Sequence, residues 1–297
     1  MLSAKSLPFH TNANKDFLRS EVDFAQIEVW YHKVGRRLKY LGLPAWEMLD
    51  IIAWDKFLDR FTTIERQEDQ QHLMFLQANV KDVEHRLHAL YGEFDQILLQ
   101  GRDQNQSVPD WPYDLVNLDY FGGFLYSDLS RPKALRKLIS NQANFQQGFL
   151  LIITQHIRDG DRIGEKSQFL EDLRRSLKGS TPDTRLCQAI DGLFDWYGSP
   201  DTPDSFRQSL YMNAFFRDIG ESEHFDVECR PAILYSGTGN AQMLHFLTNF
   251  TYRPGIGHKT VSTQSLLELI DLGLREVRNG AFAPARRSPP RLTEFPR

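Results

Sequence analysis

The stretch Asp114-Leu-Val-Asn-Leu-Asp-Tyr-Phe-Gly-Gly-Phe-Leu-Tyr126 joins a short apolar run to a polar, glycine-rich end. Leu115 and Val116 are typical of a strand buried between two helical layers. Polarity then changes abruptly at Asn117 and Asp119. Ligands of open parallel sheets bind just beyond the carboxyl ends of the strands, where an acid, aromatic rings and glycines supply an acceptor, a stacking face and close backbone approach. The alternative is a strand followed by a glycine turn and a solvated aspartate.

The composition is that of an ordinary globular protein. Hydrophobic residues make up 41% of the 297-residue chain and charged residues 25%, so we expect the chain to fold around its own core. This length suits one large α/β domain, alone or with a helical annex. The formal net charge of −4 gives no overall attraction to nucleic acid or to an anionic membrane, and only a local basic groove would bind such partners.

Cysteine usage and hydropathy predict the compartment. Cys187 and Cys229 lie far apart and in no metal-ligand pattern, and no secretory hydrophobic region is present. We therefore expect reduced thiols in a cytoplasmic protein. No segment approaches the roughly 18 consecutive apolar residues that span a bilayer, so we expect no membrane association.

Several site classes have no signature in this sequence. The nine histidines show no His-Glu-x-x-His or similar spacing, so no metal site is predicted. His245 lies in an apolar run, where we expect a hydrogen-bonded core histidine rather than a ligand. The absence of a Gly-x-Ser-x-Gly elbow and of a P-loop argues against a serine hydrolase and an NTPase.

Strands and helices alternate through the first half of the chain. Strand patterns occupy residues 38–44, 61–65, 86–90, the run from 115, and 149–154. Helical spacing of apolar residues falls at 21–37, 45–58, 69–78 and from 132 to 138. Five strands alternating with helices predict an α/β fold with a Rossmann-like, doubly wound, mostly parallel sheet.

The second half adds helices and a hairpin. Helices are predicted at 166–178, 182–197, 205–219 and 265–277. The extended runs 225–235 and 243–252 are joined by a glycine-rich turn and predict a C-terminal antiparallel hairpin. The Pro- and Arg-rich tail predicts disorder. We expect an N-terminal arm and helix at 1–37, an α/β domain at 38–260 with a helical insertion at about 166–219, and a C-terminal helix and tail at 261–297.

Two further acids lie near predicted strand ends. Glu65 ends the second strand about twenty residues after Gly42, where dinucleotide-binding folds place a carboxylate on the ribose hydroxyls. Glu93 follows the third strand. Both carboxylates have an alternative interpretation as solvated residues at the ends of strands.

Together these features resemble the class I S-adenosylmethionine (SAM)-dependent methyltransferase fold. The run Asn117-Leu-Asp-Tyr-Phe-Gly122 is similar to the Asp-Pro-aromatic-Gly signature of the guanosine tRNA methyltransferases and of the three-Cys-motif partner (TcmP-like) proteins. The resemblance covers roughly residues 38–252 and rests on order and spacing more than on identity.

The resemblance implies a SAM site and an active edge. It places Gly42 under the methionine part of the cofactor, Glu65 on its ribose and Glu93 near its adenine, with Asn117 as a further cofactor residue. The catalytic residues it implies, which would face the methyl group and the acceptor, are Asp119, Tyr120 and Phe121. The acceptor expected from these relatives is a nucleic-acid base or another amine.

The chain also departs from this family. The family's first strand ends in an acid followed by several glycines, whereas Tyr40-Leu-Gly-Leu-Pro-Ala45 has one glycine and no acid. Tyr120 stands where the family has proline. These differences favour a second hypothesis, a catalytically degenerate, methyltransferase-like subunit that binds or regulates a protein partner. A nucleic-acid substrate predicts a basic surface beside Asp119, with these candidates: Arg131, Lys133, Arg136, Lys137 and Arg158.

Overall fold

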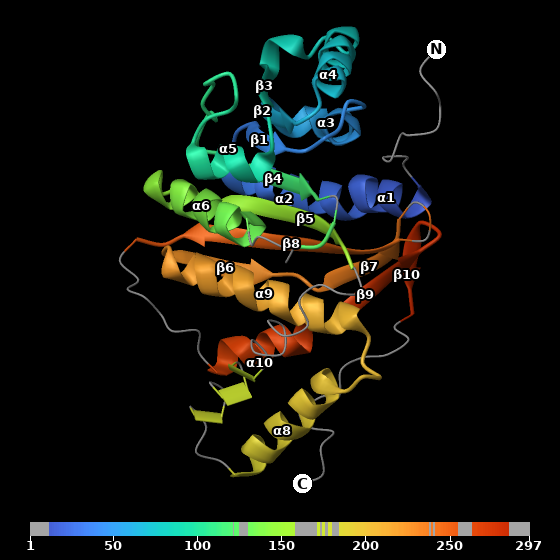
Figure 1. Cartoon of the computed structure of the whole chain (residues 1–297), viewed down its shortest axis with the longest axis vertical. Helices are drawn as coiled ribbons and strands as arrows, with labels where there is room; N and C mark the ends of the chain where they lie inside the picture. The colour runs from blue at the N-terminus through green and yellow to red at the C-terminus, as the bar shows by residue number, and fades with distance from the viewer. Residues whose placement is uncertain are drawn as a thin grey trace.

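The computed structural model of this chain describes residues 12–120, 122–124, 130–157, 171–172, 174–175, 178–179, 184–237, 239, 241–254 and 263–284. Within these residues, ten strands form one sheet with helices on both faces (Figure 1). The chain therefore has the α/β, Rossmann-like fold predicted from the alternation of strands and helices. Each helix in this part of the chain is too short or too polar to cross a bilayer.

The sheet is parallel in its first half and mixed in its second half. Its strand order is β3-β2-β1-β4-β5-β8-β7-β9-β10. Strand β6 pairs with the C-terminal end of β8, beyond the part that pairs with β7. The strands from β1 to β5 are parallel, and β8 is antiparallel to β5. The strands are β1 (Leu38–Gly42), β2 (Leu58–Glu65), β3 (Leu87–Tyr91), β4 (Leu115–Asp119), β5 (Phe149–His156), β6 (Phe225–Cys229), β7 (Ala232–Ser236), β8 (Gln242–Tyr252), β9 (Leu274–Arg278) and β10 (Ala281–Ala283).

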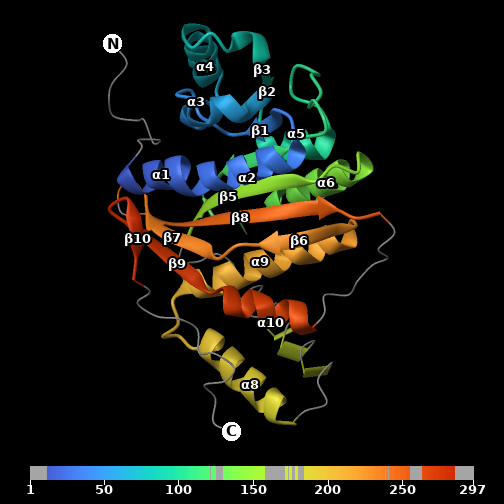
Figure 2. The same ribbon diagram turned by 180° about the vertical axis from the view of Figure 1, so that it is seen from behind.

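Two helical layers cover the sheet and enclose two apolar cores. Helices α2, α3 and α4 cover one face of the sheet, and α5, α6 and α9 cover the other (Figures 1 and 2). The described helices are α1 (Ala13–Phe17), η1 (Leu18–Asp23), α2 (Phe24–Val34), α3 (Leu49–Trp54), η2 (Asp55–Phe57), α4 (Glu68–Val80), η3 (Glu84–Arg86), α5 (Phe94–Gln100), α6 (Ser130–Asn144), α8 (Thr184–Gly198), α9 (Asp204–Ser222) and α10 (Thr263–Leu272).

The C-terminal part corrects one predicted element. The helical pattern over 265–277 predicted a single helix, but α10 ends at Leu272 and the chain continues into β9. Gly273 has a φ of +64°, a left-handed conformation that ends a helix at little cost in glycine. Strand β9 then pairs with β7, and β10 pairs with β9, so residues 274–283 extend the main sheet.

Other predicted segments differ in extent. The antiparallel hairpin exists as β7 and β8, yet β8 lies inside the sheet because it also pairs with β5. The short helix α5 follows β3 in a stretch where no helix was predicted, because seven residues carry too little helical periodicity. Most of the predicted helix at 166–178 and the tail from 286 lie outside the described residues.

The two thiols differ in accessibility, which leads to a testable prediction. Cys229 is buried at the end of β6, and burial raises the pKa of its thiol to about 12. Cys187 is only partly buried. Because the thiolate is the reactive form, we expect a thiol reagent at pH 8 to label Cys187 in the folded protein and Cys229 only after denaturation. Peptide mass mapping would distinguish this result from equal labelling of both thiols, which would contradict the burial of Cys229.

Candidate functional site

The strand order creates a switch point between β1 and β4. The chain builds the sheet outward from β1 through β2 and β3 on one side, and from β4 through β5 on the other. Ligands of open α/β sheets bind at such a point, beyond the carboxyl ends of the strands. Gly42 and Asn117 are paired directly across it in the sheet register, and Asp119 lies at the end of β4. The structure therefore brings together three of the residues singled out in the sequence.

Asp50 adds a carboxylate that sequence patterns did not single out. It lies in the first turn of α3 and accepts a hydrogen bond from Asn117 Nδ2 at 2.7 Å and one from Arg19 Nε at 2.6 Å. Burial raises the pKa of the Asp50 carboxyl group, and Arg19 offsets part of that rise. An acid in the first turn of a helix is common because the helix dipole favours it, so its position alone gave no signal of a site.

A lysine from the N-terminal helix α1 forms an ion pair with the second carboxylate of the switch point, Asp119. Lys15 Nζ lies 2.5 Å from Asp119 Oδ2, and the two side chains are 24% and 23% exposed. Burial acts to lower the pKa of the Lys15 ammonium, but Asp119 and Asp50 raise it and the net direction is upward. Lys15 therefore stays protonated, and Lys15 and Arg19 together place two positive charges on the two carboxylates at the switch point.

The N-terminal helical segment is fixed in this position by other contacts. Asn14 Nδ2 donates to the Ser236 carbonyl oxygen at 3.1 Å, and Asn14 Oδ1 accepts from the Gly280 amide at 3.1 Å. The rings of Phe17 and Phe282 lie 5.4 Å apart, edge to face. Figures 1 and 2 show α1 beside β10, at the end of the sheet toward which β4 points. The segment continues as the π-helix η1, a rare conformation often found at functional sites.

Gly42 is tightly enclosed by the chain itself. A Cβ atom at this position would lie 2.1 Å from Tyr40 Oη and 2.8 Å from the Asn117 carbonyl oxygen. Tyr40 is fully buried, which raises the pKa of its phenol well above the ordinary value. Glycine is therefore required here by the packing of Tyr40, and on this side the backbone of Gly42 faces a phenol ring.

Glu65 and Glu93 lie at the neighbouring strand ends, as the sequence predicted. Glu65 is the last residue of β2, and its Oε1 accepts from the Gln67 amide at 2.9 Å. Glu93 precedes α5, is 59% exposed and pairs with Arg66 Nη1 at 3.3 Å. Glu65 is partly buried and Glu93 is exposed, and both lie on the β2–β3 side of the switch point. Their assigned roles toward ribose and adenine stay predictions.

Tyr120 has a different environment from the one that its predicted role requires. Its side chain is 4% exposed, with the Arg131 guanidinium 4.6 Å above the ring and Phe94 at 6.0 Å, edge to face. Burial raises the pKa of the Tyr120 phenol well above the ordinary value. In this conformation the ring fills space between α5 and α6, so a base would stack on it only after Arg131 moves. Phe121 lies outside the described residues.

His245 is a hydrogen-bonded core residue, as its apolar surroundings predicted. It is 3% exposed, with Nδ1 at 2.9 Å from Thr154 Oγ1 and Nε2 at 2.8 Å from Asp23 Oδ1. Among the described residues, no group of three His, Cys, Asp or Glu side chains has a metal-binding arrangement.

The predicted basic surface is smaller than the sequence suggested. Arg131 turns inward, where it donates to the Gly123 carbonyl oxygen at 2.5 Å and lies 3.8 Å from Asp95. Three basic residues of α6 remain exposed: Lys133, Arg136 and Lys137. Arg158 lies outside the described residues.

Comparison of this chain with protein-family models and with curated proteins finds no match. Comparison with solved structures finds distant likenesses. An O-methyltransferase of tomaymycin synthesis from Streptomyces achromogenes, solved with SAM, is 13% identical over 83% of this chain and 92% of its own, with a TM-score of 0.41. A SAM-dependent methyltransferase from Agrobacterium tumefaciens is 11% identical over 79% and 62%, with a TM-score of 0.42. The methyltransferase domain of a bacterial Hen1 protein is 11% identical over 80% and 100%, with a TM-score of 0.41. Likenesses this distant do not assign a family.

Proposed function

We propose that this protein is a SAM-dependent methyltransferase whose cofactor and acceptor meet at the switch point between β1 and β4. The observation that carries the proposal is the gathering of Asp50, Asn117 and Asp119 at the carboxyl ends of these strands. This is the position at which doubly wound sheets bind ligands. Solvent-accessible Glu65 at the end of β2 supports it, since a carboxylate there suits ribose hydroxyls.

The chemistry of these side chains fits a cationic ligand. SAM carries a sulfonium and an ammonium group, and the switch point holds two carboxylates that already bind cations from Lys15 and Arg19. We infer that the N-terminal segment stands where the positive charges of the cofactor would be held, and that it must move for the cofactor to bind. Asp50, Asn117 and Glu65 would then hold the cofactor, which supplies the methyl group.

Asp119 is the residue we assign to the acceptor. Transfer to an amine needs little acid–base chemistry, because the nucleophile is the nitrogen lone pair. The protein has to orient that lone pair, exclude water and accept a hydrogen bond from the acceptor N–H. Asp119 can accept this bond once Lys15 releases it. We propose a nucleic-acid base or another amine as the acceptor.

Calorimetric titration of the full chain with SAM tests this proposal. We expect binding, and we expect Lys15→Ala to strengthen it about fivefold, because the variant removes an ion pair of about 1 kcal/mol that the ligand must displace. Glu65→Gln should weaken binding about tenfold through the loss of a charged hydrogen-bond acceptor. Glu68→Gln is the matched control, since Glu68 is an exposed residue at the start of α4 and should leave binding unchanged.

One observation favours a second function, a methyltransferase-like binding or regulatory subunit for a protein partner. The Tyr40 ring occupies the space beside Gly42 into which the methionine part of the cofactor was expected to fit. This alternative predicts no heat and no thermal shift at millimolar SAM, both for the wild-type protein and for Lys15→Ala. That result would overturn the methyltransferase proposal.

A further inference from the structure

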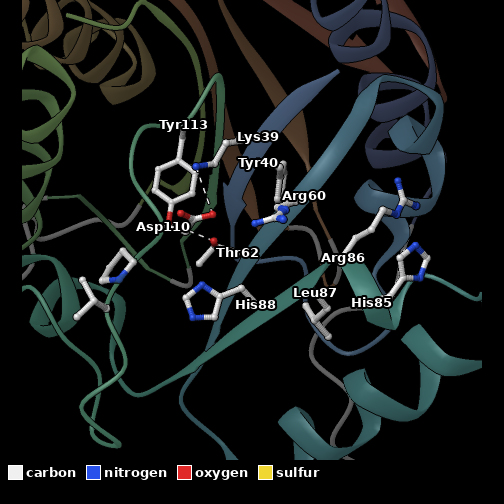
Figure 3. A pocket seen from close by; sticks show the side chains of 12 residues that line it. Lys39, Tyr40, Arg60, Thr62, His85, Arg86, Leu87, His88, Asp110 and Tyr113 are labelled. Carbon is white, nitrogen blue, oxygen red and sulfur yellow. Dashed lines mark hydrogen bonds and ion pairs between the residues drawn. The ribbon is translucent and has the colours of Figure 1, made fainter. Parts of the chain in front are cut away.

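A cavity lies away from the switch point, at the amino ends of β1, β2 and β3 (Figure 3). Its volume is about 500 Å³, which is within the range of small-molecule sites. Its polar lining includes Lys39, Arg60, Thr62, His88, Asp110 and Tyr113. The first four come from the three strands, and the last two come from the segment before β4, so the cavity joins parts of the chain distant in sequence.

Strand pairing brings the polar residues of the three strands close together. Thr62 and His88 are direct partners between β2 and β3, and Thr62 is also the partner of Leu41 in β1. Lys39 and Arg60 lie where the β1–β2 register is irregular, between Leu38 and Tyr40, and both side chains line the cavity together with Thr62 and His88. Three adjacent strands therefore project a lysine, an arginine and a histidine toward the same opening, and Figure 3 shows them around it.

The charge of this cavity is opposite to that of the chain as a whole. Its lining includes Lys39, Arg60 and Arg86 against the single acid Asp110, a formal charge of +2 with neutral histidines, whereas the chain carries −4. A concave cationic site on an otherwise acidic protein attracts anions locally. Two histidines of the lining, His85 and His88, supply further ring nitrogens that can donate hydrogen bonds.

The basic side chains of the lining differ in whether they already pair with other groups of the protein. Arg86 is held by Asp55 and donates to the Leu58 carbonyl oxygen at 2.9 Å. Lys39 Nζ lies 3.3 Å from Asp110 Oδ2. The side chains of Arg60 and His88 have no hydrogen-bond or ion-pair partner within the described part of the chain. The site therefore combines an unpaired guanidinium and an unpaired imidazole with an ammonium that has one acidic neighbour.

Hydrogen bonds hold the backbone of the lining in place at Tyr113, before β4, and at Lys39, in β1. Tyr113 Oη donates to Thr62 Oγ1 at 3.1 Å, and the backbone of Tyr113 is held on both sides by Gln142, at 2.9 and 2.6 Å. The backbone of Lys39 is fixed by Asp114, which accepts its amide at 2.9 Å. A ligand entering here would meet donors whose supporting backbone is already ordered, which lowers the entropy cost of binding.

We propose that this cavity binds the phosphate group of a small phosphorylated molecule. Arg60 supplies a planar pair of donors that matches two phosphate oxygens, and Lys39 and His88 supply donors from the strands on either side. The volume leaves room for an organic group beyond the phosphate. The proposal does not depend on methyl transfer, because none of these residues belongs to the switch point.

Titration of the full chain in phosphate-free buffer at fixed ionic strength tests the proposal. The probes are inorganic phosphate, a nucleoside monophosphate, and a single-stranded oligonucleotide without terminal phosphate. We expect saturable binding of the first two and a loss of at least about tenfold in affinity for Arg60→Ala, the effect of removing a charge-assisted bidentate contact. Arg66→Ala is the matched control, because Arg66 is an exposed arginine just beyond the carboxyl end of the same strand and should not change phosphate binding.

Three outcomes would overturn the proposal. The first is no saturable binding of either phosphate or the nucleoside monophosphate, and the second is equal weakening by Arg60→Ala and Arg66→Ala. The third is binding of the oligonucleotide alone, which would make the cavity part of a polynucleotide-backbone surface. Because Arg60 is exposed, Arg60→Ala should melt at the wild-type temperature and bind SAM as the wild-type protein does. Failure at this site is thereby distinguishable from failure of the methyltransferase proposal.

Discussion

Replacement of Asp50 by alanine is expected to lower the free energy of unfolding by about 3 kcal/mol, because it breaks a largely buried ion pair and leaves two donors without their acceptor. Arg19 and Asn117 both direct hydrogen bonds to this carboxylate, at 2.6 and 2.7 Å. The Arg19 and Asp50 side chains are only 15% and 16% exposed, so water replaces little of the lost interaction. Denaturation in urea, followed by circular dichroism, measures this difference.

Asp16→Ala is the matched control for this prediction. Asp16 binds the same guanidinium, with Oδ1 at 3.0 Å from Arg19 Nη1, but its side chain is 52% exposed. An exposed pair of this kind contributes about 0.5 kcal/mol or less. Equal losses from the two variants would show that burial at the switch point does not strengthen the Asp50 pair.

Replacement of Gly42 by alanine is expected to destabilise the protein by about 2–3 kcal/mol, the cost of overpacking a filled core. The added Cβ would lie 2.4 Å from Tyr40 Cζ as well as 2.1 Å from its Oη, so rotation of the hydroxyl group cannot relieve the contact. The Asn117 carbonyl oxygen, at 2.8 Å, belongs to the backbone of a central strand and cannot move away. A thermal melt without any ligand measures the effect.

The same variant separates two reasons for a glycine at this position. If Gly42 served only to let a cofactor approach the backbone, Gly42→Ala would melt normally and lose only SAM binding. The packing of Tyr40 instead predicts a loss of stability in the absence of ligand. Gly198→Ala is the control, because a Cβ there meets no atom within 4 Å, and we expect no loss of stability.

The sheet was predictable because its strands are marked by local composition. Residues 149–153 form a continuous apolar run, and β5 occupies it with buried residues from Phe149 onward. The ends of the strands were predictable for the same reason, since Glu65 and Asp119 are the acids at which apolar runs stop. Hydrophobic periodicity is a local signal and needs no knowledge of distant contacts.

The pairing of Lys15 and Arg19 with the two carboxylates at the switch point was not predictable from such patterns. Lys15 and Asp119 are 104 positions apart, Asn117 and Asp50 are 67 apart, and Arg19 and Asp50 are 31 apart. A lysine and an arginine on a short N-terminal helix are ordinary solvent-facing residues in sequence. Their burial against carboxylates follows from the docking of that helical segment on β7, the β9–β10 turn and β10, which is a tertiary contact.

The phosphate cavity also depends on the fold. Lys39, Arg60 and His88 are single polar residues in three separate strands, and alternation along each strand is equally compatible with a face open to water. The sequence by itself determined the five parallel strands and the acids and glycine at their ends, because these depend on neighbours in the chain. Only the tertiary structure decided that Lys15 and Arg19 occupy the switch point and that a cationic cavity forms at the other end of the strands, because both arise from strand register and helix docking between residues far apart in the chain.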